Sequence, residues 1–293
     1  MLAFCLLAPL GDAFAKLLGQ TMPLLQILIV RFGMQIILMV PVMWIGNVRF
    51  HLEWRIINWL ILRTFLHIIS VGTMFYSLRF LPLADAIAIA FVMPFILLIL
   101  AKFILKEEIG PRRIIACTIG FVGTLFVIQP SFAIVGIRAL YPLAAALGFA
   151  LYILVTRKVA KQAETVNLQI ASGLIGTIIL AVVYVATKNH ELAQFHLITP
   201  NSQEILLLIA IGFIGTFAHS LMTLALRFAP SATLAPMQYL EIPMATLFGL
   251  IIFSDLPNGL ATIGIVITIA AGLYIVLRER QTMRAIPAHA ETG

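Results

Sequence analysis

LRFLPLADA at residues 78–86 returns in large part as LRFAPSATL at residues 226–234, 148 positions further along the chain. Five of the first seven letters agree, and each copy lies where one long apolar run ends and the next begins. The match continues at the same offset, because Glu107 corresponds to Asp255. The two halves of the chain are therefore expected to be copies of one unit.

The composition places this unit in a lipid bilayer. The chain is 62% hydrophobic and only 11% charged, with a mean hydropathy of +1.08, whereas globular proteins are roughly 45–50% apolar and about 25% charged. Its net charge of +7 comes from short basic clusters between apolar runs, so a nucleic-acid-binding face is not expected. Cys5 and Cys117 lie inside apolar runs and are predicted to be small buried hydrophobes, with no metal or cofactor.

A transmembrane helix needs roughly 20 mostly apolar residues, and ten such runs can be placed. They cover approximately 2–19, 22–45, 57–79, 83–104, 112–129, 138–157, 165–186, 204–227, 231–253 and 258–277. The sequence therefore predicts an all-α integral membrane protein with ten transmembrane helices.

The distribution of Lys and Arg predicts the orientation of these helices. Most of them fall in segments on the same side as the N-terminus, which the positive-inside rule makes the cytoplasmic side of the inner membrane. Both termini are then cytoplasmic. An odd number of spans separates the two copies, so the halves point in opposite directions, as in many secondary transporters. The predicted division is 1–130 and 131–280 as two five-helix repeats, with 281–293 a disordered tail.

The residues that carry this repeat also resemble a known family. LPLADAIAIAFVMPFILLILAKFILKEEIGPRRIIACTIGFVGTLFVI at 81–128 and its counterpart at 229–276 have small residues at the start of a span, a proline within it and an acidic residue closing it. With LGDAFAKLLGQTMPLLQILIVRF at 10–32, they resemble the EamA-type ten-helix branch of the drug/metabolite transporter superfamily. The second half departs from the pattern, since SDLPNG stands where the first half has KEEIGP.

The resemblance implies a secondary transporter of a small metabolite, with a central cavity lined by the first four spans of each half. No HExxH or GxSxG motif is present, so a membrane-embedded enzyme is not expected. A channel is a different class, which needs a continuous polar pore. The expected partners are a metabolite, membrane lipid and a coupling proton or exchanged solute, and a monomer and a homodimer are both open.

Ionisable residues within the apolar runs are the candidate site, because each costs about 2.5–3.5 kcal/mol at the bilayer centre on insertion scales. Glu241 is the first of them: it lies near the middle of its span, beside Gln238 and Tyr239 and shortly before Pro243. It is interpreted either as a proton-linked or cation-attracting carboxylate, or as a structural partner of a buried arginine.

Arg31 and Arg63 are the positive candidates. Arg63 and His67 are four residues apart and so share one helical face, where a substrate carboxylate could bind. The alternatives are that Arg31 pairs with Asp12 or Glu241 and that Arg63 extends to the cytoplasmic interface.

Three further residues complete the candidate site. Asp12 is one turn from Lys16, and the two either neutralise each other or leave Asp12 for a ligand. His219 and Tyr152 are expected to line the cavity or to pack between helices. The mixed signs favour an amino-acid-like zwitterion, such as S-adenosylmethionine, as the substrate, with a carboxylate or an exported amine or drug as alternatives.

Overall fold

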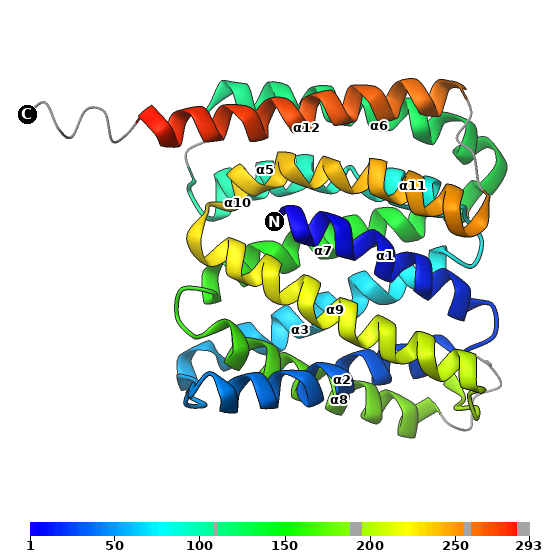
Figure 1. Ribbon diagram of the computed structural model, residues 1–293, viewed down its shortest axis with the longest axis vertical. Helices are drawn as coiled ribbons and strands as arrows, with labels where there is room; N and C mark the ends of the chain where they lie inside the picture. Colours follow the sequence, from blue (N-terminus) through cyan, green and yellow to red (C-terminus); the bar gives the residue numbers. More distant parts are fainter. Residues whose placement is uncertain (108–109, 188–194, 255–258, 286–293) are drawn as a thin grey trace, which may run out of the picture.

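A computed structural model describes residues 1–107, 110–187, 195–254 and 259–285, and in these residues every regular element is helical. The α-helices are α1 (Leu2–Gly19), α2 (Leu24–Ile45), α3 (Ile57–Ser77), α4 (Leu83–Ala90), α5 (Met93–Ile104), α6 (Pro111–Val135), α7 (Leu140–Val159), α8 (Thr165–Thr187), α9 (Ser202–Phe228), α10 (Ser231–Leu234), α11 (Glu241–Phe253) and α12 (Gly259–Ala285). Short 3-10 helices are η1 (Trp54–Ile56), η2 (Gly136–Ala139) and η4 (Ala235–Leu240). Most of the helices run in nearly the same direction or its opposite (Figure 1).

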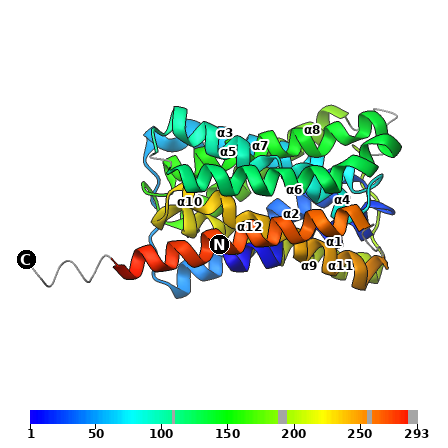
Figure 2. The ribbon, with the colours of Figure 1, turned by 90° about the horizontal axis from the view of Figure 1, so that it is seen from above.

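The two copies of the repeated sequence lie at opposite ends of this bundle. Figure 2 shows α4, which begins within the first copy, at the end of the bundle opposite to α10, which lies within the second. At the α4 end, Arg79 Nη2 donates to the carbonyl of Met22, 2.7 Å away. At the α10 end, Arg227 forms two hydrogen bonds with Glu164, at 2.6 and 3.0 Å. This arrangement agrees with two halves of opposite orientation.

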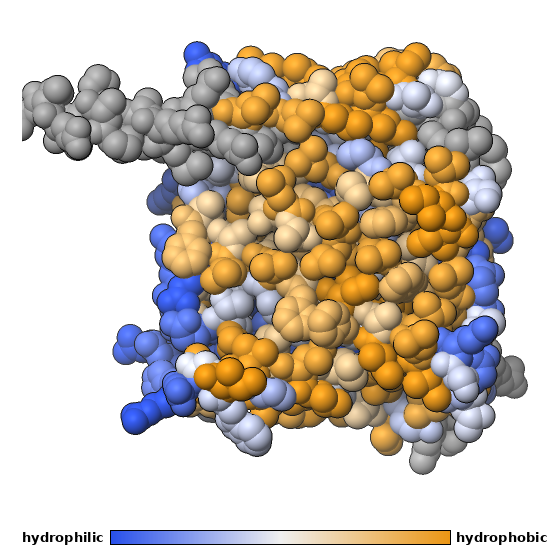
Figure 3. Space-filling view, in the orientation of Figure 1, coloured by the Kyte–Doolittle hydropathy of each residue, from blue (hydrophilic) through white to orange (hydrophobic). Residues whose placement is uncertain are grey.

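The surface of the bundle is that of a multi-pass membrane protein. Hydrophobic side chains cover the middle of the visible face, and hydrophilic ones gather at its two opposite edges (Figure 3). Among the described residues, eight helical segments are long and apolar enough to cross a membrane. Shorter apolar stretches, Ile114–Phe126 and Thr262–Ala271, lie in α6 and α12. A total of ten spans remains a prediction.

Two of the predicted spans are broken in the structure, one in each half. The span predicted at 83–104 is α4 followed by α5, and the span at 231–253 is α10, η4 and α11. Pro94 lies in the first turn of α5, and Pro243 lies in the first turn of α11. The breaks have a local cause, because proline lacks the N–H that would continue the helix and disfavours helical backbone in the preceding residue.

Outside these breaks, the helix ends follow local signals. Asn201 and Glu204 form a capping box at the start of α9, with hydrogen bonds of 2.9 and 2.8 Å between each side chain and the other's backbone N–H. Ser254 ends α11 with φ of 56°. At the other end of the chain, α12 continues to Ala285, so the first residues of the predicted disordered tail are helical, and 286–293 lie outside the described residues.

Helices α6 and α12 pack against each other on one side of the bundle, away from α2 and α8 (Figure 1). A Cβ atom on Gly123 of α6 would lie 2.8 Å from the carbonyl oxygen of Gly264 in α12, so only glycine permits this approach. Small residues play this part in membrane helices, where close packing replaces the hydrophobic effect. The pair α6 and α12 serves as scaffold.

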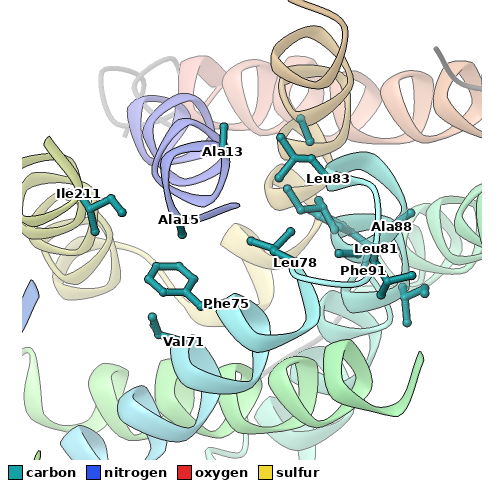
Figure 4. Close-up of a cluster of buried hydrophobic side chains, with 14 of the residues drawn as sticks. Ala13, Ala15, Val71, Phe75, Leu78, Leu81, Leu83, Ala88, Phe91 and Ile211 are labelled. Atoms are coloured by element: carbon teal, nitrogen blue, oxygen red, sulfur yellow. The ribbon is translucent and has the colours of Figure 1, made fainter. Parts of the chain in front are cut away.

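The remaining helices pair mostly across the two halves: α1 lies against α9, α2 against α8, and α3 against α7. Ala15 of α1 points toward Phe75 of α3, with Ile211 of α9 on the same side, whereas Ala13 lies on the opposite side of α1 (Figure 4). The apolar cluster extends to α4 through Leu83. This cross-half packing leaves a space at the centre of the bundle.

Candidate functional site

A cavity lies at the centre of the bundle, lined by residues of α1, α2, α3, α4, α5, α7, α9 and α11. The centres of water molecules can occupy about 100 Å³ of it, which is enough for several waters. The two broken segments both reach it. Met93, the first residue of α5, and Glu241, the first residue of α11, line it from the two halves. These residues are 148 positions apart and so occupy equivalent positions in the two repeats. Only the second repeat has an acidic side chain at this position.

Asp12 of α1, Arg31 of α2 and Glu241 line this cavity together. Asp12 interacts electrostatically with both of the others. Among the described residues, however, no ion pair or hydrogen bond joins the three, and Glu241 Oε1 is a buried oxygen without a partner. Three ionisable groups thus line one cavity without forming ion pairs with one another. This leaves them available to a ligand.

Arg31 is held in place by its surroundings rather than by an acid. Its Cζ atom lies 5.7 Å from the centre of the Phe75 ring. On the other side, the guanidinium packs against the backbone of α9, where a Cβ atom on Gly215 would lie 2.7 Å from Cζ. Gly215 and Phe75, which sequence reasoning missed, therefore set the position of the charge. The only sequence signal at Gly215 is a small residue in the middle of an apolar span.

Aromatic rings form another part of the cavity wall. Phe4 of α1, Phe149 of α7 and His219 of α9 all line it. The Phe4 ring is stacked on Phe149 with centres 6.2 Å apart and meets the edge of His219 at 5.7 Å. Phe91, at the break between α4 and α5, also lines the cavity. The cavity thus combines fixed charges with aromatic faces that can stack on a planar ring or a cation.

Arg63 lies neither at the cavity nor at the membrane interface. It is fully buried and donates to neutral acceptors on three other helices. The acceptors are Thr156 at 2.9 Å, Tyr152 at 3.0 Å, Thr223 at 3.1 Å, Gln169 at 3.3 Å and Ser172. These bonds tie α3 to α7, α8 and α9. Arg63 is thus bonded to neutral side chains of the neighbouring helices and does not line the cavity.

His67, Tyr152 and His219 form a layer between Arg63 and the cavity. The His67 ring is stacked 4.6 Å from Tyr152 and lies 4.3 Å from His219. Tyr152 Oη is 3.5 Å from His219 Nδ1. Of these three, only His219 lines the cavity, and neither ring nitrogen of His67 has a partner among the described residues.

Tyr239 and Gln238 do not line the cavity. The Tyr239 hydroxyl donates to the carbonyl of Cys117 at 3.0 Å, and its ring lies against Gly120 of α6. Gln238 is fully buried between apolar side chains, and its amide has no partner among the described residues. These two neighbours of Glu241 in sequence therefore point away from Glu241's cavity. Among the described residues, no three His, Cys, Asp or Glu side chains are grouped to hold a metal.

Comparison with known proteins identifies the family. The EamA-like transporter family matches residues 1–129 and 136–278. The chain belongs to this family. A solved structure with 16% sequence identity has the same fold, with a TM-score of 0.73 over 96% of this chain and 97% of the other. The resemblance seen in the sequence is thus confirmed.

Named relatives of this EamA-like protein are transporters of small metabolites. An S-adenosylmethionine uptake transporter of Rickettsia prowazekii is 26% identical over 94% of this chain and 90% of its own length. A riboflavin transporter of Rhizobium johnstonii is 26% identical over 82% of this chain and 76% of its own. Family and relatives together make this protein a multi-pass membrane transporter of a small metabolite.

Proposed function

We propose that this EamA-like protein moves a zwitterionic, amino-acid-like metabolite by alternating access, with S-adenosylmethionine as the first candidate. The observation that carries the proposal is the set of Asp12, Arg31 and Glu241, which line one cavity and, in the part of the chain that the structure describes, make no direct pairs with one another. Such charges are costly in a membrane unless they are paired or serve a function. A ligand of complementary charge supplies the missing partners.

S-adenosylmethionine complements this set group by group. Its carboxylate suits the guanidinium of Arg31, which offers a planar fork of N–H donors. Its ammonium and sulfonium groups suit the carboxylates of Asp12 and Glu241. Its adenine ring suits the wall formed by Phe4 and Phe149. The R. prowazekii relative, named for S-adenosylmethionine uptake, supports the same choice.

Alternating access follows from the broken helices and the opposed halves. The pieces of each broken segment meet at the cavity, where their freed backbone groups can be satisfied by water or substrate. Rocking of one half against the other then opens the cavity to either side in turn. Asp12 and Glu241 line the same cavity, and two carboxylates that share one site favour the binding of a proton between them. Proton coupling and exchange are both consistent with this arrangement.

Ligand-induced thermal stabilisation of the purified protein tests the substrate class. The panel is S-adenosylmethionine, methionine, adenosine, riboflavin and a dicarboxylate, each tested on wild type and on Asp12→Asn, Arg31→Gln and Glu241→Gln. We expect S-adenosylmethionine to raise the unfolding temperature of wild type and to act less on all three variants. Stabilisation that survives unchanged in all three variants would contradict the site, and stabilisation by none of the amino-acid-like ligands would contradict the substrate class.

Riboflavin is the second candidate, favoured by the aromatic lining and by the R. johnstonii relative. A flavin has a large planar ring system and no ammonium group. It should therefore depend on Phe4 and Phe149 more than on Asp12 or Glu241. If Phe149→Leu abolishes stabilisation while Asp12→Asn leaves it intact, the flavin is the better assignment.

We also propose that the protein lies in the inner membrane with both termini cytoplasmic, and that its two repeats divide at about residues 130–131. The basic residues gathered toward one side support the orientation, and the two matched family segments support the division. Labelling of Arg79→Cys and Arg227→Cys with an impermeant thiol reagent tests the orientation of the two halves. Reaction of both cysteines from one and the same side would refute the opposed orientation.

A further inference from the structure

At the end of the bundle where α10 begins, one carboxylate joins two elements from different halves. Glu107, just after α5, accepts hydrogen bonds from the backbone N–H groups of Ser231 and Ala232 at 3.3 and 3.0 Å and from the Ser231 hydroxyl at 2.9 Å. The first-half segment is thereby fastened to the start of α10. The same carboxylate lies 3.5 Å from Nε of Arg157, near the end of α7.

Arg157 extends the contact to a fourth helix. Its Nη1 donates to the carbonyl oxygens of Leu226 and Arg227, at the end of α9. The Glu107 and Arg157 side chains are only 12% and 13% exposed, so solvent screens this pair less than a surface pair. We call Glu107 and Arg157, with the backbone groups they bind, the latch. The latch connects α5, α7, α9 and α10.

An apolar plug lies directly beneath the latch. Leu226 and Leu234, which belong to the latched segments, pack there with Leu97, Ile153 and Met222. The void among these side chains is too small to hold a water molecule. The same cluster continues inward to Phe4 and Met93, which line the charged cavity. The apolar cluster therefore connects the cavity with the latched segments.

One polar side chain, that of Gln238, lies among the apolar side chains of this plug. Gln238 borders the small void, is fully buried, and has neither its amide nitrogen nor its amide oxygen hydrogen-bonded among the described residues. Burying a polar group without partners is unfavourable. The amide gains its partners if water or a solute enters between α5, α7 and α9.

We propose that this region is the closed half of the transport route, in which the Glu107–Arg157 latch holds the plug shut and Gln238 is the polar group that meets the solute when it opens. The amide offers both a donor and an acceptor, which suits a solute with an ammonium and a carboxylate. The proposal rests on the proposed transport function. Opening it requires the latch to break, because the plug residues belong to the helices that the latch connects.

Reporter cysteines test the latch without any substrate. In a Cys5→Ala, Cys117→Ala background, Leu97→Cys reports on the plug and Met74→Cys reports on the cavity near the opposite end of α3. Each reporter is labelled with a water-soluble maleimide in three proteins: the Cys5→Ala, Cys117→Ala background itself, and the same background carrying Glu107→Gln or Arg157→Gln. The matched control is Glu164→Gln, which removes the ion pair with Arg227 at the same end, where the side chains are 54% and 30% exposed.

We expect both latch variants to raise the labelling rate of Leu97→Cys by about fivefold or more, since loss of a modest interaction shifts a two-state population by that factor. Met74→Cys should label more slowly in the same variants, and Glu164→Gln should change neither rate. A plug reporter that stays unreactive in both latch variants overturns the proposal. So does faster labelling at both reporters, which indicates loosening rather than a gate. These labelling rates are measured without substrate. If S-adenosylmethionine does not bind, that result contradicts only the proposed function and not the latch.

Gln238 is tested by solute movement. Gln238→Leu fills the same volume without the polar group, and Gln238→Glu keeps an acceptor. Uptake of S-adenosylmethionine into proteoliposomes should fall in Gln238→Leu while thermal stabilisation by the solute, which reports on the cavity, stays as in wild type. Unchanged uptake in Gln238→Leu overturns the role of the amide.

Discussion

Gly215→Ala is expected to weaken substrate binding without unfolding the protein. A Cβ atom at this position would lie 2.7 Å from Cζ and 3.2 Å from Nη2 of Arg31, well inside van der Waals contact. The guanidinium is the far end of a flexible side chain, so it will move while the backbone of α9 stays. Alanine is also a better helix former than glycine, by about 1 kcal/mol, so the helix itself is not weakened.

The size of the effect follows from the contact that is lost. A hydrogen bond to a charged group contributes about 1.5–3 kcal/mol, and every 1.4 kcal/mol is tenfold in affinity. Displacing Arg31 from the substrate carboxylate should thus raise Kd by roughly 10- to 150-fold. The assay is a titration of thermal stabilisation by the metabolite that the panel identifies, with Arg31→Gln measured beside it.

Gly11→Ala is the matched control. Gly11 lines the same cavity from α1, but the nearest atom to a Cβ there is Ile214 Cγ2 at 3.5 Å, an ordinary contact. We expect its Kd to stay within about threefold of wild type. The double variant of Gly215→Ala with Arg31→Gln should bind no more weakly than Arg31→Gln alone, because both changes remove one interaction. Wild-type affinity in Gly215→Ala, or equal weakening in Gly11→Ala, would refute the reasoning.

Three further predictions concern the residues around the site. Tyr239→Phe removes the hydrogen bond to the Cys117 carbonyl and should cost about 1 kcal/mol in the free energy of unfolding, with substrate Kd unchanged; a change in Kd without a loss of stability would place the hydroxyl on the ligand. Arg63→Met leaves buried hydroxyl and amide groups without their donor and should lower the unfolding free energy by at least about 2 kcal/mol, seen in chemical denaturation, with Arg63→Lys less affected; full stability in Arg63→Met would contradict the packing role. The hydrogen bond from Arg227 lowers the pKa of Glu164, so the pair should contribute its full, small stabilisation above the ordinary carboxyl pKa and lose it as the pH falls through the lowered value. Glu164→Gln should therefore reduce the dependence of the unfolding temperature on pH between about pH 3 and 5, and an unaltered profile would show that the pair contributes nothing.

Sequence reasoning worked where the determining interaction is local. The length of each apolar run identifies a membrane helix because the bilayer imposes that length. The repeat at offset 148 predicts the opposed halves, and α4 and α10 do lie at opposite ends of the bundle. The breaks before Pro94 and Pro243 also had a local cause. A proline within an apolar run was the available signal.

The candidate site was only partly predictable. The sequence picked out the polar residues inside the spans, and the structure brings Asp12, Arg31, Glu241 and His219 to one cavity. In the structure, Arg63 instead donates hydrogen bonds to neutral side chains. A sequence gives the depth of a residue in the membrane but not the helix that its side chain faces, because that rotation is set by the packing of its neighbours.

The amino-acid sequence by itself determined that this chain spans the membrane repeatedly, belongs with the EamA-like transporters and carries ionisable groups at mid-bilayer depth. Apolar length, internal repetition and the placement of Pro are properties of the chain alone. Only the tertiary structure decided which of those groups share a cavity and which are satisfied by packing, and it alone placed Glu107 against α10 and Gly215 against Arg31. Such contacts join residues more than 100 positions apart, and their existence depends on how the two halves interlock.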